Sequence, residues 1–378
     1  MDFEFSAEQD ALRDSLRRYL QNHYSFEQRR AVLRSESGDN PKAWAAFADM
    51  GLLGLAIPQD MGGMGGTGID ILLAMELFGE HLALEPYLAT VVLGAGILRD
   101  AGSPAQRALL PHVVAGEIRL ALAHQEPQVR AIDGIVRTQA TRLADGGWRL
   151  DGHKAVVLGA PAADYLLVSA TTRTGQASVF MLERATPGLR LHAYANHDGQ
   201  RAADVFLDNV AVPADALVGQ AGDGMAIVER ALQEANAALC CEAVGVMDAL
   251  NRQTLEYLKT RKQFGVAIGS FQALQHRMAD MTVATFQARS MALLVSARLH
   301  VASPAERARL VSAAKAYVCQ QARFVGQQAV QLHGGMGIAD ELITGHYFKR
   351  LTLIGQTFGD AQYHLGRFSA TLLETEAT

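Results

Sequence analysis

Two short stretches of the chain combine residue types that suit the binding of a phosphate-bearing ligand. Residues 261–265 read Arg-Lys-Gln-Phe-Gly, which places two cations beside an aromatic ring and a glycine. Residues 331–337 read Gln-Leu-His-Gly-Gly-Met-Gly. Guanidinium groups bind phosphate oxygens, and glycines let backbone N–H groups approach an anion closely. Either stretch alone is typical of an ordinary helix end, but together they indicate a site for a dinucleotide pyrophosphate.

Two long helices bring these stretches together in the predicted fold. From Phe271 onward, apolar or small residues recur at alternating intervals of three and four, which predicts a buried helical stripe ending near His300. Ser303 and Pro304 then break the helix, and a return helix is predicted from Ala305. Each helix is about 40–45 Å long at 1.5 Å per residue. Antiparallel helices of matched length place both stretches at one end of a helical bundle.

Composition limits the class of protein. The 378 residues exceed one hydrophobic core, so two or three domains are expected. The net charge of −5 gives no general attraction to nucleic acid or to an acidic membrane. The three cysteines, Cys240, Cys241 and Cys319, have the spacing of neither a metal site nor a disulfide framework, which favours a reducing compartment. We find no signal peptide and no long apolar run, and we therefore expect a soluble cytoplasmic protein.

The first 118 residues are predicted to be helical. Ser6 followed by Gln9 is a capping box, and residues 44–53 carry apolar side chains at helical spacing. The glycine-rich stretch 57–68 lacks the Lys-Ser/Thr pair of a phosphate-binding P-loop, so it is interpreted as a flexible connection.

The pattern changes to short alternating runs from about Leu120. Residues 140–143 and 148–150 flank an Asp-Gly-Gly turn, which predicts a β-hairpin. Further strands are predicted at 165–170, 177–182, 189–192 and 204–207. The chain is therefore predicted to be mainly α with a central β-domain, divided into an N-terminal helical domain (1–118), a small antiparallel β-domain (119–224) and a C-terminal helical bundle (225–378).

The two bundle stretches resemble the motifs of the acyl-CoA dehydrogenase family. The likeness covers the whole chain, from Phe-Ser-Ala-Glu-Gln near the start to Phe-Gly-Asp-Ala-Gln-Tyr-His near the end. Within the family, Ala-Leu-Cys-Cys-Glu-Ala-Val-Gly and His-Tyr-Phe-Lys-Arg-Leu-Thr look most like small subunits of two-component enzymes such as pimeloyl-CoA dehydrogenase. The resemblance implies a C-terminal four-helix bundle, an FAD cofactor and removal of two hydrogens from Cα and Cβ of an acyl-CoA thioester.

The resemblance also assigns cofactor-binding residues. In the family both turns come from one subunit and reach an FAD held mainly by its neighbour. Arg261 would pair with phosphate, Phe264 would pack beside the adenosine, and the glycines would admit the backbone. The full predicted set is Arg261, Gln263, Phe264, Gln331, Gly334 and Gly335.

The flavin half departs from the family pattern. The family's Thr-Glu-Pro is matched by Gln125-Glu126-Pro127. Its Lys-x-aromatic-Ile-Thr, which lies along the flavin ring, is matched by residues 154–158, Lys-Ala-Val-Val-Leu. The aromatic ring and the threonine hydroxyl are both missing, which argues against a flavin held by this chain's own β-domain.

The reaction needs a base at Cα and donors that stabilise the enolate oxygen. The two positions where the family keeps its carboxylate base are matched by Phe358 and Ala235. Glu234 is the candidate catalytic base, but it would serve only if the helix were rotated or carried a π-bulge. Asp360 is a second candidate, and either acid could equally be a surface or structural carboxylate.

The sequence leaves three hypotheses. In the first, the chain is a subunit of an α2β2 acyl-CoA dehydrogenase in acyl-CoA degradation, with a homologous large subunit that supplies the glutamate base. The substrate would be a dicarboxylic or ring-bearing acyl-CoA, and an electron-transferring flavoprotein would be the electron acceptor. In the second, it is a self-sufficient homotetramer with a displaced base. In the third, it is a non-catalytic scaffold that has lost FAD.

Overall fold

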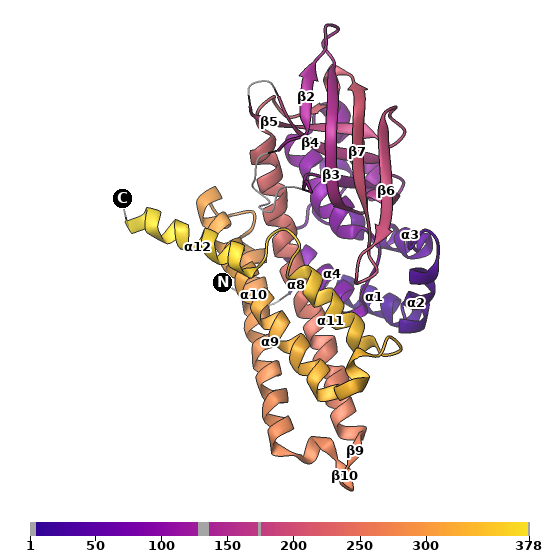
Figure 1. The fold of residues 1–378 in the computed structure, drawn as a ribbon, viewed down its shortest axis with the longest axis vertical. Helices are drawn as coiled ribbons and strands as arrows, with labels where there is room; N and C mark the ends of the chain where they lie inside the picture. Colours follow the sequence, from indigo (N-terminus) through magenta and orange to yellow (C-terminus); the bar gives the residue numbers. More distant parts are fainter. Residues whose placement is uncertain (1–4, 128–135, 173–174, 377–378) are drawn as a thin grey trace. The chain divides into compact units, whose positions relative to one another are not determined.

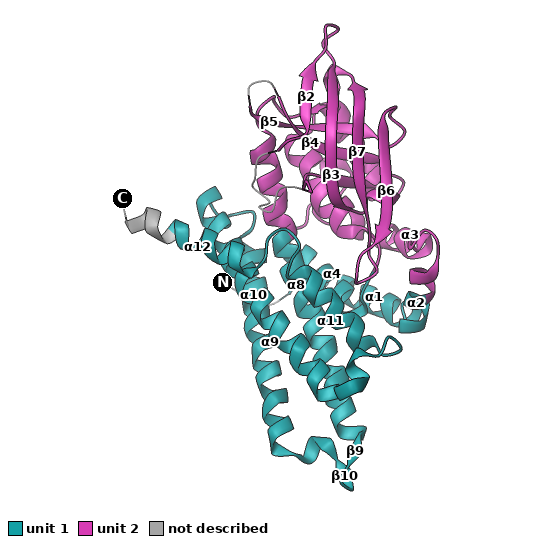
Figure 2. Cartoon of the chain, in the orientation of Figure 1, with its two compact units in different colours: residues 1–30, 67–83, 236–378 teal, residues 31–66, 84–235 magenta. Residues whose placement is uncertain are grey.

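The computed structural model describes residues 5–127, 136–172 and 175–376, which fall into two compact units (Figure 2). Unit 1 is drawn from 1–30, 67–83 and 236–378, and unit 2 from 31–66 and 84–235. The predicted boundary near 118 lies between α7 (Leu110–Val114) and β1 (Leu120–Ala123), and the one at 224 falls on the first residue of α8 (Gly224–Thr260), after β8 (Leu217–Val218). The division into three domains stays a prediction.

Unit 1 is a helical bundle with one small hairpin (Figure 1). Its elements are α1 (Ala7–His23), α4 (Gly68–His81), most of α8, β9 (Lys262–Gln263), β10 (Val266–Ala267), η6 (Ile268–Ser270), α9 (Gln272–Arg298), α10 (Pro304–His333), η7 (Gly334–Ile338), α11 (Ile343–Ile354) and α12 (Ala361–Glu376). α2 (Phe26–Arg34) spans the boundary between the units. None of the helices in the described part of the chain combines the length and apolar character needed to cross a bilayer.

The predicted helix signals of unit 1 are confirmed. Ser6 and Gln9 form the capping box of α1, and the Ser303 side chain accepts a hydrogen bond from the backbone of Glu306 at the start of α10. α9 and α10 pack side by side, as their matched lengths predict.

The apolar stripe of α9 is buried only in part. Its buried residues, from the middle of the helix to its end, are Met281, Ala284, Thr285, Ala288, Ala292, Val295 and Ser296. The prediction was wrong for the first turns, where Phe271 is 39% exposed and Leu274 and Met278 are half-buried. Helical spacing predicts which residues share a face, but it does not say how far along the helix that face is covered.

Unit 2 combines short helices with a sheet (Figure 1). The helices are α3 (Pro41–Asp49), η1 (Leu52–Gly54), η2 (Gln59–Met61), the π-helix η3 (Leu88–Ala95), α5 (Gly96–Ala101), α6 (Pro104–Arg107), α7, η4 (Ala160–Ala162) and η5 (Ala214–Ala216). The other strands are β2 (Gln139–Arg142), β3 (Trp148–Leu158), β4 (Tyr165–Thr171), β5 (Ala177–Glu183), β6 (Leu189–Ala195) and β7 (Arg201–Val212).

The sheet has the order β6-β7-β3-β2-β4-β5-β8, with β1 paired to β4. The predicted hairpin is confirmed, because β2 and β3 pair in antiparallel register across the Asp-Gly-Gly turn. The sheet is mixed rather than wholly antiparallel, since β4 pairs in parallel with both β1 and β2. Alternation along a strand identifies its buried face but does not fix the direction of its neighbour.

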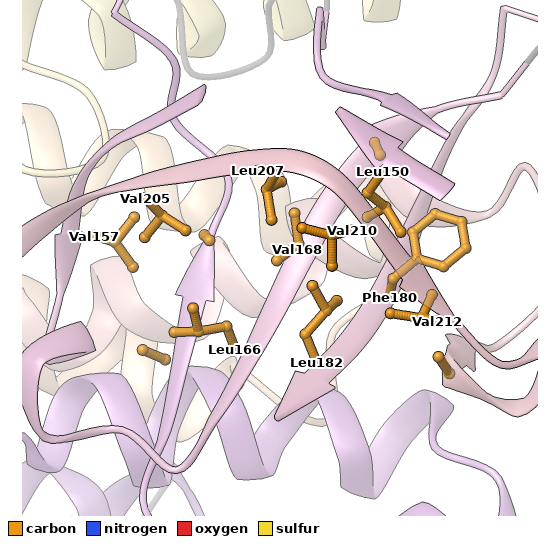
Figure 3. Packing of buried hydrophobic residues seen from close by; sticks show 14 of the residues in the cluster. Leu150, Val157, Leu166, Val168, Phe180, Leu182, Val205, Leu207, Val210 and Val212 are labelled. Carbon is orange, nitrogen blue, oxygen red and sulfur yellow. The ribbon is translucent and has the colours of Figure 1, made fainter. Parts of the chain in front are cut away.

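The core of unit 2 lies on one face of this sheet (Figure 3). Its large side chains come from strands that are distant in sequence, and they include Leu150, Val157, Leu166, Val168, Phe180, Leu182, Val205, Leu207, Val210 and Val212. This core fixes β3, and therefore the part of the chain that resembles the flavin-contacting motif.

The glycine-rich stretch is not a flexible connection, contrary to expectation. Backbone hydrogen bonds hold it, including Met64 N–H to Gly54 O at 2.9 Å and Gly65 N–H to Ile57 O at 2.8 Å. A Cβ on Gly63 would lie 2.1 Å from Ile57 O. Glycine is therefore needed there for close backbone packing.

Candidate functional site

The basic stretch forms a tight hairpin at the end of α8 (Figure 1). β9 and β10 pair through a two-residue turn, in which Phe264 and Gly265 have φ values of +51° and +81°. Positive φ at both positions is the geometry of a type I′ turn, for which Asn-Gly is the usual sequence. Phe264 is thus strained, and its side chain is 91% exposed. Neither backbone preference nor burial within this chain favours an aromatic ring here.

The hairpin presents its cations to solvent. Ile268 N–H donates to Arg261 O at 2.8 Å and closes the hairpin, while the side chains of Arg261, Lys262 and Gln263 are exposed. Among the residues that the structure describes, none forms a side-chain hydrogen bond or ion pair with Arg261 or Lys262. Both cations can therefore bind an anionic group outside this chain.

The glycine stretch forms the open turn at the end of α10. Gly334 has φ +60° and ψ −144°, a conformation that is essentially restricted to glycine, and its N–H donates to Gln331 O. A Cβ on Gly334 or on Gly335 would meet no atom within 4 Å. The space over both residues is open, so an anionic group can reach their backbone.

The helix ends that lead into the two turns are in contact, in keeping with the helix lengths. Tyr257, one helical turn before Arg261, stacks on His333, the residue before Gly334, with ring centroids 4.4 Å apart. The Tyr257 hydroxyl donates to His333 O at 3.3 Å. All six predicted cofactor-binding residues therefore lie on two turns of unit 1 that one contact joins, while their role in binding FAD stays a prediction.

A buried ion pair lies at the Gln-Glu-Pro stretch of unit 2. Lys154 is fully buried, and its Nζ donates to Glu126 Oε1 at 2.7 Å, Ser169 Oγ at 3.1 Å and His124 O at 3.2 Å. Burial lowers the pKa of Lys154 to about 8, against the opposing effect of Glu126. Burial by itself would raise the pKa of Glu126, but hydrogen bonds from Lys154 and Thr138 lower it. The pair joins the middle of β3 to Glu126, which in turn accepts a hydrogen bond from the Thr138 backbone at 2.9 Å.

β3 then makes a bulge at Val156. Val156 has φ +52°, which is rare for a β-branched residue, and its side chain is 44% exposed. Its N–H donates to Asp204 Oδ1 at 3.2 Å, and the same oxygen accepts the Tyr194 hydroxyl at 2.8 Å. The bulge stands at the position where the family keeps its aromatic ring, but Val156 and Leu158 provide neither a ring nor a hydroxyl.

Phe358 stands in a strained turn between α11 and α12. Its φ is +55°, and its carbonyl accepts hydrogen bonds from Asn236 Nδ2 at 3.3 Å and His364 Nε2 at 3.0 Å. Burial, together with the nearby charge of Lys315, lowers the pKa of His364 to about 4, so the ring is neutral at neutral pH. The turn is therefore firmly held, but it carries a side chain that cannot accept a proton.

Glu234 is held in an ion cluster of unit 2. Its carboxylate accepts hydrogen bonds from Arg99 Nη2 at 2.9 and 3.1 Å and pairs with Arg230 Nη2 at 2.8 Å. α8 is a continuous α-helix here, without the π-bulge that would turn Glu234 toward the direction of Ala235. Glu234 would have to leave both guanidinium groups to reach a substrate proton. This geometry favours a structural role, whereas its assignment as the catalytic base stays a prediction.

The other candidate acid, Asp360, caps α12 and accepts a hydrogen bond from the Tyr363 backbone at 2.8 Å. It lies at a cavity of about 470 Å³ between α10, α11 and the start of α12. The lining side chains combine an apolar floor with several amides: Cys319, Gln320, Ala322, Arg323, Gln327, Phe348, Leu351, Thr352, Gln356, Asp360, Ala361 and Gln362.

The sequence motifs did not predict one positioning residue, Lys315. Lys315 is fully buried in α10, and its Nζ donates to Ile354 O at 2.7 Å and Thr357 O at 3.0 Å. It thereby holds the end of α11 directly before Phe358. A lone lysine on the buried face of the return helix, between Val311 and Cys319, is the signal that could have identified it.

The chain matches family profiles along most of its length. These are described as the N-terminal (residues 6–117), middle (121–210) and C-terminal (222–373) domains of acyl-CoA dehydrogenase. The chain belongs to the acyl-CoA dehydrogenase family. Members of this family are FAD-dependent oxidoreductases, and FAD is its cofactor.

Among similar proteins is the L-prolyl-[peptidyl-carrier protein] dehydrogenase of Pseudomonas fluorescens, which is 29% identical over 78% of this chain and 80% of its own length. The solved structure of the Tcur3481-Tcur3483 steroid ACAD is 30% identical with a TM-score of 0.89, covering 98% of this chain and 99% of that one. The ChsE4-ChsE5 complex from Mycobacterium tuberculosis is 27% identical with a TM-score of 0.90, covering 99% of both chains.

The two parts of the site fit FAD unequally. The exposed cations of the hairpin and the open glycines of the second turn suit a pyrophosphate, and the exposed Phe264 ring suits a flat base. In unit 2, Val156 and Leu158 lack the side-chain groups that the family places along the flavin ring. The residues of this chain therefore fit the adenosine half better than the flavin half, while their binding of FAD stays a prediction.

Proposed function

We propose that this chain is one subunit of an α2β2 acyl-CoA dehydrogenase, and that a homologous partner supplies the catalytic carboxylate and the aromatic flavin contact. The observation that carries the proposal is the pairing of the hairpin and the glycine turn through Tyr257 and His333. In this proposal the two turns would supply the adenosine side of the FAD site, in a chain with Phe358 and Ala235 at the positions that match the family's base. Two similar solved structures support this assignment, because each is named for two different proteins.

Dehydrogenation moves a proton from Cα and a hydride from Cβ of the thioester. FAD, when bound, would supply the acceptor for the hydride. A carboxylate must take the proton, and neither Phe358 nor Ala235 can do so, which is why we assign this step to the partner. In this chain, Arg261 would pair with pyrophosphate oxygens, and the backbone N–H of Gly335 would donate to them, since the N–H of Gly334 already donates to Gln331 O.

The substrate class follows less directly. We propose a ring-bearing or dicarboxylic acyl thioester, with electrons passing to an electron-transferring flavoprotein. The similar structure that is named as a steroid ACAD supports a ring-bearing acyl group. The prolyl-carrier enzyme among the relatives makes a carrier-bound thioester the comparison to include in any substrate panel.

A second candidate function is a self-sufficient homotetramer that uses Asp360 as its base. It is favoured by the position of this exposed carboxylate at the 470 Å³ cavity. Glu234 is the less favoured base for such an enzyme, because two arginines hold it.

The test is to purify the chain alone and together with its homologous partner. Flavin content is measured from the visible spectrum, and each sample is titrated anaerobically with acyl-CoA and acyl-carrier thioesters. We expect about one flavin per two chains in the complex, and a lone chain that retains little flavin. One flavin per lone chain that bleaches with substrate would refute the shared site, and Asp360→Asn would then show whether Asp360 is the base.

A further inference from the structure

The helices that lead into the hairpin and the glycine turn touch through Tyr257 and His333. Tyr257 lies in the last turn of α8, where its carbonyl accepts the N–H of Arg261 at 2.8 Å. His333 is the last residue of α10, directly before Gly334. Their rings stack at 4.4 Å with an interplanar angle of 26°, and the Tyr257 hydroxyl reaches His333 O.

His333 is itself fixed by its own helix, α10, and by one further helix, α11. Its Nδ1 lies 2.8 Å from Ala329 O in α10, and its Nε2 lies 3.4 Å from Thr344 Oγ1 in α11. A carbonyl can only accept, so Nδ1 carries the proton and Nε2 accepts from the Thr344 hydroxyl. A Cβ on Gly337 would lie 3.1 Å from His333 Cβ, so the chain beyond the glycine turn packs closely against the same residue.

We propose that Tyr257 and His333 are positioning residues, which set the spacing between the Arg261 guanidinium and the Gly334–Gly335 backbone so that one FAD pyrophosphate can contact both. This inference rests on the proposed function, because it concerns the same adenosine-side surface. It goes further by assigning a role to two residues that would not themselves touch the phosphate.

The constraints on the two turns support this role. The glycine turn is open above Gly334 and Gly335, and the hairpin tip is exposed. Tyr257 donates to the carbonyl of His333, so it constrains the His333–Gly334 peptide and thereby the course of the backbone that leads into Gly335. Through its own carbonyl it also fixes the start of the hairpin.

A double-mutant cycle on the assembled complex separates positioning from simple packing. The dissociation constant of FAD is measured by flavin fluorescence after reconstitution of the apo-complex, for wild type, Arg261→Ala, Tyr257→Ala, Tyr257→Phe and the Tyr257→Ala/Arg261→Ala double variant. Loss of the Arg261 contact should weaken binding about tenfold, the size of one charge-assisted hydrogen bond. Tyr257→Ala should weaken it by a similar factor, and Tyr257→Phe, which keeps the stacked ring, by about threefold.

The double variant decides the matter. If Tyr257 acts by positioning Arg261, the FAD dissociation constant of the double variant should be close to that of the single variant that binds FAD less tightly. Multiplication of the two effects, to about a hundredfold, would mean that Tyr257 contributes independently of Arg261 and would overturn the inference. If Arg261→Ala weakens FAD binding but Tyr257→Ala does not, the inference fails alone. If Arg261→Ala has no effect, the proposed function fails with it.

Tyr19→Ala and Tyr19→Phe provide the matched control. Tyr19 makes another tyrosine–histidine ring contact in unit 1, with His23 at 5.0 Å. These variants should leave the FAD dissociation constant unchanged. Thermal midpoints of every variant without FAD show whether folding is intact, and Tyr257→Phe keeps the test informative if Tyr257→Ala fails to fold.

Discussion

Replacing Glu234 with glutamine distinguishes a structural carboxylate from a catalytic base. Glu234 is 6% exposed and lies between Arg99 and Arg230, which are 11% and 22% exposed. Removing one charge from a buried ion cluster leaves its partners uncompensated, and such losses cost about 3–5 kcal/mol. Glutamine keeps one hydrogen-bond acceptor, so we expect a loss of about 2–4 kcal/mol.

This loss should be visible in the thermal midpoint of the assembled complex. For a unit of roughly 150–250 residues, 1 kcal/mol shifts the midpoint by about 2–4 °C, so Glu234→Gln should lower it by about 5–15 °C. Turnover per bound flavin, measured well below both midpoints, should stay within about threefold of wild type if Glu234 is structural. Loss of a general base would instead lower turnover by about 10²–10⁴-fold.

The control is Glu256→Gln on the same helix. Glu256 pairs with Lys259 at 2.8 Å, but both side chains are more than half exposed, so its loss should cost no more than about 0.5 kcal/mol. The reasoning is refuted if Glu234→Gln leaves the midpoint at the control value while turnover falls a hundredfold or more. That result would make Glu234 the base and would favour the self-sufficient enzyme.

Three further outcomes are expected. Phe264→Asn should stabilise the lone chain slightly, by about 0.5–1 kcal/mol, because asparagine tolerates positive φ. The same substitution should lower the retention of FAD by the complex. Unchanged FAD retention in an equilibrium-dialysis assay would count against a contact between Phe264 and the adenosine. The folded-state pKa of Lys154 is lowered to about 8 from 10.5, so between these values the unfolded chain binds a proton that the folded chain has lost. Its contribution to the free energy of unfolding should therefore rise with pH across that window, and the pH slope measured by urea denaturation should be flatter in Lys154→Met. The same sign applies to His364, whose pKa is lowered to about 4 from 6.5. Acidification across this window should lower the free energy of unfolding by up to about 3 kcal/mol. A His364→Gln variant whose stability depends on acid pH as the wild type's does would contradict this.

The fold could be predicted where local pattern and packing coincide. The apolar stripe of α9 and the break at Ser303–Pro304 predicted the two long helices. The lengths of these helices predicted that both turns lie at one end of the bundle. The prediction was wrong where packing depends on distant residues. Gly63 is ordered by the backbone of Ile57, a close approach that composition does not reveal. The parallel pairing of β1 with β4 joins segments about 45 residues apart.

The site could be predicted in residue type but not in its interactions. The turns carrying Arg261 and Gly334 were identified from charge and glycine spacing. The environment of Glu234 could not be predicted, because its partner Arg99 lies 135 residues earlier in the chain. Tyr257 belongs to the first motif and His333 to the second, but nothing in either spacing shows that their rings stack.

Backbone strain separates the competing functions. Three of the five non-glycine residues with positive φ in the described chain, Val156, Phe264 and Phe358, stand at positions that the family resemblance singles out. Such a conformation costs on the order of 1–2 kcal/mol and persists only where the surrounding structure enforces it. Asp204 holds Val156, and the Asn236 and His364 side chains hold Phe358, so the strain at these two positions belongs to the fold.

Phe264 is different, because only the two-residue turn itself demands its positive φ. Asparagine would satisfy that turn at lower cost, and the exposed ring gains little from burial within this chain. A scaffold without FAD would therefore be more stable without this phenylalanine. The strain and exposure of Phe264 become favourable once a ligand or a neighbouring subunit covers the ring, and this makes the FAD-free scaffold the weakest of the three hypotheses.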